Sequence, residues 1–505
     1  MSSEILPRPP GSESEIPLTD TSAPASGYIN RAATGSAFLI LRQVLVQFVN
    51  MAGGVVLARY LSVGEYGFLG VVAYALGVLA SLGDLGLTMS LLQQKNEPTE
   101  REYSVAFTAQ VALAVLAAAG FLCLMPWMQG HYRLDDSYQV FLAVAAGSFL
   151  ISLFRSIPQT KLERDLRFTE LAVLEIILAL VYNGCAIGLA ISGAGVWSFM
   201  TAIVLRSAVS VVALNVVSRA RLCPTWDWGV LRRQLGTGFP MQLTSYIALL
   251  KDSVSPVIIG MTLGLAATGI ANMAGLIANV PAYLCSVLSR VYLPTFSRAR
   301  DSAVDLKRIL DTAVFVVNSI VAPLSFFVLL FRESFTVILF GEKWLPTEVL
   351  FPYLWTANLV VPTVHICLGL LNAIGESRRN VTFSVLWAVL AIGAGAPLVS
   401  LFGLVGLGYA ILLVNLATVA YLIMVKAAYG YNVLPGIVKG WLPSVVAAGV
   451  FWVGRSTIPL GYHRAADAIY VGGIVYLLLA AAFWFAVYSK TAVSSVRAAL
   501  RGRRG

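Results

Sequence analysis

Residues 104–127, SVAFTAQVALAVLAAAGFLCLMPW, contain no charged side chain and indicate how the chain folds. A hydrocarbon core about 30 Å thick is crossed by ~20 apolar residues in a helix, so this stretch can span a membrane. Thirteen other stretches along the chain have the same character. The fourteen predicted spans are 36–58, 67–92, 104–127, 138–157, 170–191, 195–217, 238–262, 267–293, 309–331, 349–372, 380–401, 404–425, 437–457 and 467–488. The sequence therefore predicts an all-α polytopic membrane protein.

The charges between these spans are sorted by loop number. About 25 of the 35 Lys and Arg residues fall in the termini and the even-numbered loops, about six in the odd-numbered loops and four inside spans. Because cytoplasmic loops carry the excess of basic residues, this bias predicts a multi-pass protein of the cell inner membrane with both termini in the cytoplasm. The same bias accounts for the net charge of +10 without a nucleic-acid partner.

Composition and motifs argue against an enzyme. Hydrophobic residues make up 58% of the chain and charged residues 12%, about half the charged fraction of a soluble protein. No Walker loop is present, and the three His and five Cys residues do not fall at zinc spacing. We expect no cofactor and no metal. The outer loops are too short to hold a catalytic domain.

The spans suggest two halves. We expect two six-helix bundles related by a pseudo-twofold axis along the membrane normal, followed by two further helices, because an even number of spans keeps repeats parallel. A weak repeat at a displacement of about 202 residues supports this division. The predicted parts are a disordered cytoplasmic tail (1–33), an N-terminal lobe (34–217), a basic cytoplasmic loop (218–236), a C-terminal lobe (237–426), two additional helices (427–489) and a basic cytoplasmic tail (490–505).

Ionisable residues inside the spans are the first candidates for function, since each costs ~2.5–3.5 kcal/mol at the bilayer centre. They are Arg42, Asp84, Arg155, Glu175, Arg206, Lys251 and Asp252. Arg155 lies near a span end, where snorkelling explains it, and an ion pair with a loop Arg would satisfy Glu175. Structural and functional roles stay open for Arg42. Arg206 and Lys251 lie near the middle of their spans, which favours function over a plain interhelical ion pair.

Polar residues at helical spacing mark several spans. Small and polar residues commonly join membrane helices, which explains any one of these stripes. Five such stripes, together with charges in both halves, favour a wet central cleft. The polar residues predicted to line it are Gln47, Asn50, Asn272, Asn279, Asn358 and His365.

Six short stretches carry a resemblance to known proteins. They are LARYLSVGEYG (57–67), DLGL (84–87), KLERDLRF (161–168), IGMTLG (259–264), VYLPTFSR (291–298) and LFGEKW (339–344). With these stretches in this order, residues 34–426 resemble the multidrug/oligosaccharidyl-lipid/polysaccharide (MOP) exporter superfamily. The resemblance is to its bacterial polysaccharide and O-antigen repeat-unit flippases in particular, a group that includes teichuronic acid exporters.

The resemblance implies a carrier that moves an undecaprenyl-diphosphate-linked oligosaccharide from the cytoplasmic to the periplasmic leaflet by alternating access. Arg42, Arg206 and Lys251 would contact the phosphates, and the polar lining would contact sugar hydroxyls. Asp84 or Asp252 would serve ion coupling, although Asp252 could instead neutralise its neighbour Lys251. The implied partners are the lipid-linked substrate, membrane lipid, and the glycosyltransferases and polymerase of the same pathway.

Other functions stay open. An ion-coupled drug or cation antiporter of the same superfamily predicts a cleft dominated by carboxylates, whereas four buried cations here face three anions. A lipid II flippase would differ in substrate only. A membrane-embedded polysaccharide polymerase or ligase would need a sizeable outer loop, and a scaffold would need no charges inside the membrane.

Overall fold

Helices make up all the regular structure in the part of the chain that the computed structural model describes. The described residues are 45–94, 96–132, 135–219, 223–281, 292, 295–300, 302–457 and 472–501. No strand occurs among them. The predicted tail at 1–33 lies outside these ranges, as does part of the tail at 490–505. An all-α polytopic fold is confirmed.

The first half of the chain begins with a helix at residues 45–60. It continues with α2 (Val63–Asp84), α3 (Leu87–Gln93), α4 (Glu100–Tyr132), α5 (Ser137–Ser152), a 3₁₀ turn (Leu153–Arg155), α6 (Ser156–Arg164), α7 (Phe168–Ile191) and α8 (Val196–Ser218).

The second half begins with α9 (Trp228–Asp252), a π-helical segment (Val254–Ile259), α10 (Gly260–Leu263) and α11 (Leu265–Ala278). After a gap in the description come α13 (Ala303–Leu330), α14 (Arg332–Phe340), a 3₁₀ segment (Glu342–Val349), α15 (Phe351–Ala373), α16 (Ser377–Phe402), α17 (Leu404–Tyr429), α18 (Leu434–Thr457) and α20 (Ile474–Arg501).

Eleven helical segments of the described residues are long and apolar enough to cross a membrane. They correspond to eleven of the fourteen predicted spans. The remaining three, 36–58, 267–293 and 467–488, each run into residues outside the described ranges, so the number fourteen stays a prediction.

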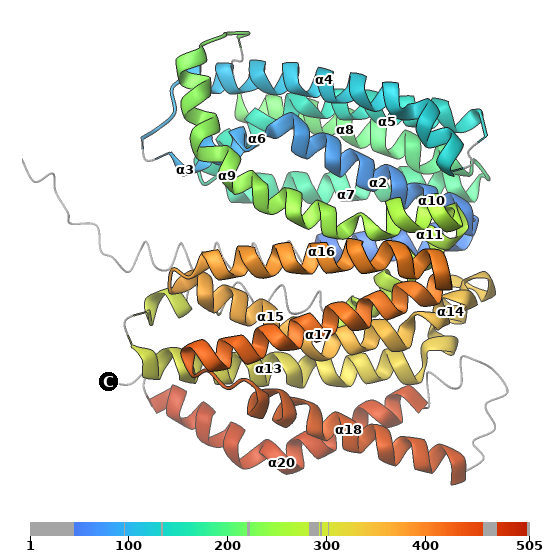
Figure 1. Ribbon diagram of the computed structural model, residues 1–505, viewed down its shortest axis with the longest axis vertical. Helices are drawn as coiled ribbons and strands as arrows, with labels where there is room; N and C mark the ends of the chain where they lie inside the picture. The colour runs from blue at the N-terminus through green and yellow to red at the C-terminus, as the bar shows by residue number, and fades with distance from the viewer. Residues whose placement is uncertain are drawn as a thin grey trace, which may run out of the picture.

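The helices form two groups along the long axis of the molecule (Figure 1). In one group α2 packs on α4 and α5, and α8 packs on α5 and α7. In the other, α13 packs on α15 and α18, α17 packs on α15 and α16, and α18 packs on α20. The two groups are joined by α9, which contacts α3 of the first group and α16 of the second, and by the contact between α2 and α11.

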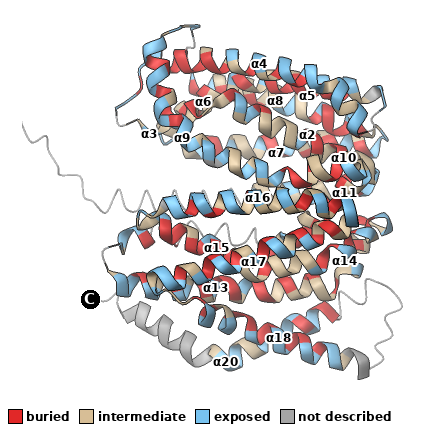
Figure 2. Cartoon of the chain, viewed as in Figure 1, coloured by how far each residue is buried: buried red, intermediate tan, exposed pale blue. Residues whose placement is uncertain are grey.

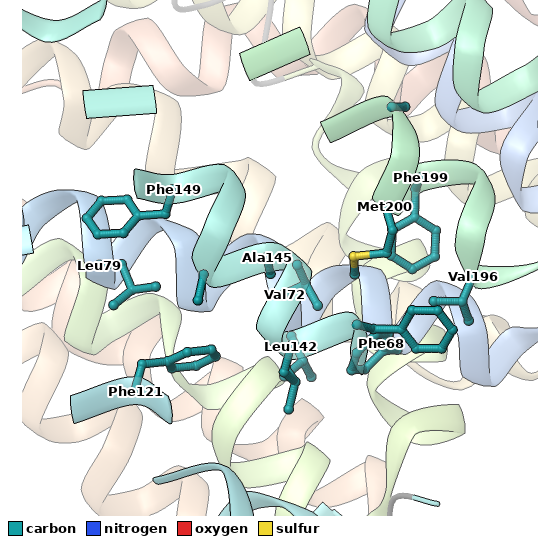
Figure 3. Packing of buried hydrophobic residues seen from close by; sticks show 14 of the residues in the cluster. Phe68, Val72, Leu79, Phe121, Leu142, Ala145, Phe149, Val196, Phe199 and Met200 are labelled. Carbon is teal, nitrogen blue, oxygen red and sulfur yellow. The ribbon is translucent and has the colours of Figure 1, made fainter. Parts of the chain in front are cut away.

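Each group has an apolar core. In the first, Phe68 of α2, Leu142 of α5 and Phe199 of α8 are buried together, as Figure 3 shows. In the second, Val314 of α13 and Leu370 of α15 belong to one buried cluster. Apolar residues also cover the outer surface, where exposed and buried positions alternate along most helices (Figure 2). Helices that are apolar on all sides are typical of a protein whose solvent is lipid.

Two boundaries differ from the sequence prediction. The basic loop predicted at 218–236 is shorter, because α9 starts at Trp228, where the Asp227 carboxylate accepts hydrogen bonds from the amides of Gly229 (2.9 Å) and Val230 (3.2 Å). The span predicted as one helix at 238–262 changes to π-helical hydrogen bonding after Asp252. Pro256 lies in that segment and has no amide hydrogen to donate, which explains the change.

Candidate functional site

Lys251 and Asp252 end α9 just before the π-helical segment and form an ion pair. The Lys251 Nζ lies 3.1 Å from Asp252 Oδ1 and 4.5 Å from the ring centroid of Trp387 on α16. Side-chain exposure is 30% for the lysine and 61% for the aspartate, so the carboxylate is the more open of the two. The neutralisation that the sequence raised as an alternative is therefore present.

This charged pair lies where the two helix groups meet. Tyr74 of α2 donates a hydrogen bond to the Leu249 carbonyl (3.2 Å), which ties the first group to α9. His365 of α15 is exposed and lies within electrostatic range of Lys251. The Lys251 ammonium thus lies over the Trp387 ring of α16 and within electrostatic range of the His365 imidazole of α15. An ammonium there can attract an anionic group that enters between the helix groups.

Asp84 has a different environment from the one predicted for an ion-coupling residue. Its Oδ1 accepts hydrogen bonds from the Thr88 amide (3.1 Å), the Thr88 hydroxyl (2.5 Å) and Gln110 Nε2 (2.7 Å). Its Oδ2 accepts from the Gly86 amide (3.1 Å). The chain turns here through left-handed backbone at Leu85 and Gly86, and the carboxylate caps the start of α3. These contacts give Asp84 a structural role: it caps α3 and joins this turn to Gln110 of α4.

Arg206 of α8 lines a cavity whose lining, within the described residues, does not include Lys251. This cavity, of about 620 Å³, lies inside the first helix group, and Asp84 and Arg155 also line it. The Arg206 guanidinium carbon lies 5.8 Å from the ring centroid of Tyr182 on α7. Arg42 lies outside the described residues, so its predicted role stays a prediction.

The predicted polar lining divides into helix contacts and open positions. The Asn50 Oδ1 accepts from Asn183 Nδ2 (3.1 Å), and the Asn272 Oδ1 accepts from the Ser255 hydroxyl (2.7 Å). Asn358 is buried and donates to the Ala278 carbonyl (2.8 Å). These three amides join helices, in keeping with the packing interpretation. Gln47 is half-buried and Asn279 is exposed, so both can meet a ligand.

From the sequence, no role was assigned to a set of contacts that join the end of α14 and the 3₁₀ segment after it to the end of the helix at residues 45–60. Arg59 donates to the carbonyls of Leu339 (2.8 Å) and Ile338. Lys343 donates in return to the carbonyls of Arg59 (2.8 Å) and Leu61 (2.6 Å). We call this set, together with Trp344, the latch.

Trp344 anchors the latch. It is fully buried, and its indole N–H donates to the Ala58 carbonyl (2.9 Å). Tyr66 of α2 meets its ring edge-on, with centroids 5.2 Å apart. Burial lowers the pKa of Lys343, while the negative charge of Glu65 opposes that shift. The only sequence signal was that the motifs at 57–67 and 339–344 both carried the resemblance. The structure brings these two motifs together.

No group of three or more His, Cys, Asp and Glu side chains with metal-site geometry occurs within the described ranges. The chemistry on offer consists of an ammonium at the junction of the helix groups, guanidinium groups in a cavity of the first group, and amides and hydroxyls between helices. Such groups bind anions and sugars without making or breaking covalent bonds.

Comparison with known proteins agrees with this architecture. The family model described as polysaccharide biosynthesis protein matches residues 56–349. The lipopolysaccharide biosynthesis protein WzxC of Escherichia coli strain K12 is 22% identical over 458 residues, which are 86% of this chain and 87% of that protein. The succinoglycan biosynthesis transport protein ExoT of Rhizobium meliloti is 25% identical over 344 residues, 68% of this chain and 69% of that protein.

Solved structures share the fold. The lipid II flippase MurJ in an inward closed conformation has a TM-score of 0.73 at 11% identity, with 91% of this chain and 99% of that chain covered. An inward-facing multidrug transporter of the MATE family, in the MOP superfamily, has a TM-score of 0.60 at 12% identity, with 77% and 94% covered.

Proposed function

This chain belongs to the polysaccharide biosynthesis protein family, and from that premise we propose that it is a flippase of the MOP superfamily for a lipid-linked oligosaccharide. In the proposal, it moves a polyprenyl-diphosphate-linked repeat unit from the cytoplasmic to the periplasmic leaflet. Relatives named for lipopolysaccharide biosynthesis and succinoglycan transport support this substrate class. Family and fold point to a transporter rather than to an enzyme.

The observation that carries the proposal is the Lys251 ammonium at the junction of the two helix groups. A diphosphate has to lose most of its hydration to cross hydrocarbon, and a charge inside the membrane is costly without a partner. Lys251 can supply that partner when the diphosphate replaces Asp252 at the ammonium. The half-buried Gln47 and the exposed Asn279 would then meet sugar hydroxyls.

The apolar part of the substrate needs a different environment. A cavity of about 610 Å³ between α13, α15, α17 and α18 is lined mainly by apolar side chains, among them Phe326, Trp355 and Trp441. Lys426, at the end of α17, lies on the cavity wall. In the proposal, this cavity holds part of the polyprenyl chain, and Lys251 binds the diphosphate outside it.

Alternating access would come from rocking of the first lobe, 34–217, against the second, 237–426. The latch supports this, because it joins the two halves of the chain at the end where α14 meets the helix at residues 45–60, and rocking of the lobes would break it. With both termini in the cytoplasm, that end is the periplasmic one, and the closed latch corresponds to a carrier that is shut toward the periplasm. The latch has to break for the substrate to leave.

The test is deletion of the gene, followed by analysis of where lipid-linked oligosaccharide accumulates. We expect completed repeat units to be trapped on the cytoplasmic leaflet. Wild type should release them, and Lys251→Ala should not, at equal membrane level. Lys307→Ala, an exposed lysine at the start of α13, is the matched control and should behave as wild type.

Two other results would contradict the flippase. Normal export in the deletion strain, once redundant carriers are removed, would favour the drug or cation antiporter, whose fold is represented by the MATE transporter. Units that cross but stay unpolymerised would point to a polymerase or ligase. In the proposed pathway, glycosyltransferases supply the substrate on one side and a polymerase consumes it on the other.

A further inference from the structure

A polar cavity lies inside the first helix group, apart from the Lys251 region. Its volume of about 620 Å³ is in the range of ~300–1,000 Å³ typical of small-molecule sites. Its walls come from α2, α4, α5, α6, α7 and α8. Two arginines, Arg155 and Arg206, face it together with Gln110, Gln159, Glu163 and Tyr182. A cavity with two guanidinium groups inside a membrane-spanning bundle calls for a ligand or a compensating charge.

The carboxylates on the cavity wall are already engaged by the chain itself. Asp84 accepts four hydrogen bonds: two from the Gly86 and Thr88 amides at the start of α3, one from the Thr88 hydroxyl and one from Gln110 of α4. Glu163 accepts from Gln159 Nε2 (2.8 Å). Neither carboxylate forms an ion pair with Arg155 or Arg206 among the described residues. The negative charges of Glu163 and Glu175 act on Arg155 electrostatically, and the positive charge of Arg206 opposes them.

The two guanidinium groups keep most of their donors available. Arg155 Nη1 makes one long hydrogen bond, 3.4 Å, to the Ser210 hydroxyl. Arg206 lies 5.8 Å from the Tyr182 ring centroid and, within the described residues, makes no hydrogen bond. Each guanidinium has five N–H donors in a planar fork that matches a carboxylate or phosphate. Two such forks in the lining of one cavity offer paired donors to an oxyanion that enters it.

Gln110 adds an independent sign of a ligand. This side chain is only 2% exposed, and within the described part of the chain its Oε1 has no hydrogen-bond partner. Its Nε2 donates to Asp84 Oδ1 (2.7 Å) and Thr88 Oγ1 (3.2 Å). The opposite orientation of the amide would place its oxygen against the Asp84 carboxylate, where two acceptors would meet. An unmade hydrogen bond at a buried acceptor costs about 1–3 kcal/mol. A ligand hydroxyl in the cavity would remove that cost.

We propose that this cavity binds a sugar that carries an oxyanion, with Arg155 and Arg206 on the carboxylate or phosphate, Gln110 Oε1 on a ring hydroxyl, and Tyr182 against the sugar face. The inference rests on the proposed function for the source of the ligand, which is an acidic sugar of the transported glycan. The diphosphate stays at Lys251, outside this cavity. The cavity then determines specificity for the glycan, whereas Lys251 serves every lipid-linked substrate.

Direct binding tests the site without any transport. The full-length protein in nanodiscs is titrated with glucuronate, glucose 6-phosphate, glucose and inorganic phosphate. We expect glucuronate and glucose 6-phosphate to bind at least tenfold more tightly than glucose or phosphate alone. Arg206→Gln and Arg155→Gln should each weaken that binding at least tenfold, and Arg206→Lys should weaken it as well, because it loses the planar fork.

Controls separate this site from the Lys251 region and from misfolding. Lys251→Gln should bind glucuronate as wild type does. Gln110→Leu, which keeps the volume and removes the acceptor, should weaken binding of glucuronate but not of inorganic phosphate. Equal affinity of wild type and a folded Arg206→Gln for glucuronate would overturn the proposal. Phosphate binding as tight as that of glucose 6-phosphate would overturn the sugar part and leave a simple anion site.

Transport then identifies the source of the sugar. Liposomes with the protein receive two lipid-linked glycans that differ only in one acidic sugar. Arg206→Gln should slow the acidic glycan at least fivefold and leave the neutral one unchanged. An equal loss for both would assign Arg206 to the diphosphate and overturn the inference. If wild type moves neither glycan yet binds glucuronate, the flippase proposal fails, whereas the site itself stands with a soluble acidic sugar as its ligand.

Discussion

Asp84 illustrates what a sequence can and cannot say about one buried carboxylate. The energetic cost of a charge inside a membrane span made Asp84 a candidate for ion coupling. In the structure, both of its carboxylate oxygens accept hydrogen bonds from the chain itself. The signal for the cap was present in the Asp-x-Gly-x-Thr pattern at 84–88, since Asp favours turns in which its side chain bonds to later amides. The bond from Gln110 joins residues of different helices, which no local pattern predicts.

We therefore predict that Asp84→Ala destabilises the protein by about 2 kcal/mol, because it removes a helix cap and a charge-assisted hydrogen bond. Asp84→Asn keeps the three contacts of Oδ1, loses only the one from the Gly86 amide to Oδ2, and should lose less stability. Thermal unfolding in detergent measures both. If Asp84→Asn abolished transport at unchanged stability, Asp84 would be an ion-coupling residue after all.

For the ion pair of Lys251 and Asp252 we predict a gain in substrate affinity rather than a loss of stability. The sequence allowed either mutual neutralisation or a shared cavity, and only coordinates could supply the 3.1 Å contact. If the diphosphate has to displace Asp252, Asp252→Asn should tighten binding of a short-chain polyprenyl diphosphate by a few-fold, in line with the ~0–1 kcal/mol of an exposed ion pair. Fluorescence titration of the purified variant measures this. Weaker binding by Asp252→Asn would mean that the carboxylate helps to hold the substrate.

At the scale of elements, length and apolar character were predictable, whereas internal irregularity was not. The change from α9 to a π-helical segment depends on Pro256 and on the choice of carbonyl that each amide meets, such as the Ile258 amide, which donates to the Ser253 carbonyl five residues earlier (3.4 Å). Proline is common in membrane helices, so its presence alone did not predict the change. The latch was equally hidden, because its two motifs are about 280 residues apart and bond mainly through backbone carbonyls.

The latch should control the equilibrium between the two faces of the carrier. Trp344→Phe removes one buried hydrogen bond and destabilises the closed state by about 1 kcal/mol. Lys343→Met removes the ammonium and with it two further hydrogen bonds. Spin labels at Gly64 on α2 and at Glu342, in a background without native cysteines, would report their separation. We expect a longer-distance population to grow in Trp344→Phe and to dominate in the double variant. Lys307→Met is the control, and an unchanged distance distribution in the double variant would contradict the latch.

At the scale of the whole molecule, hydropathy predicted the fold class but not the arrangement of the helices. In α8 the small polar Ser210 is fully buried, while Val212 and Val216 are 64% and 69% exposed. In lipid an outward valine costs nothing, so apolar residues occupy both sides of the helix and leave little trace of the buried face. Prediction of the site is limited in the same way. The sequence placed Arg206 and Lys251 in one cleft, whereas in the structure Arg206 lines the cavity of the first group and Lys251 pairs with Asp252 at the end of α9.

The number of spans can be settled by the sidedness of the loops, because each span reverses it. Fourteen spans predict that a tag after Gly264 is reached from outside intact cells, one at Ser302 only after permeabilisation, and one after Gly341 again from outside. This alternation requires a span within 267–293. Tags at residue 30 and after Ser62 test the span at 36–58 in the same way, and tags at residue 462 and at the C-terminus test the last one.

If Ser302 were reached from outside, the two halves could not have the same orientation. The parallel repeat, and with it rocking of two equivalent lobes, would then be wrong even if the protein transports the lipid-linked glycan.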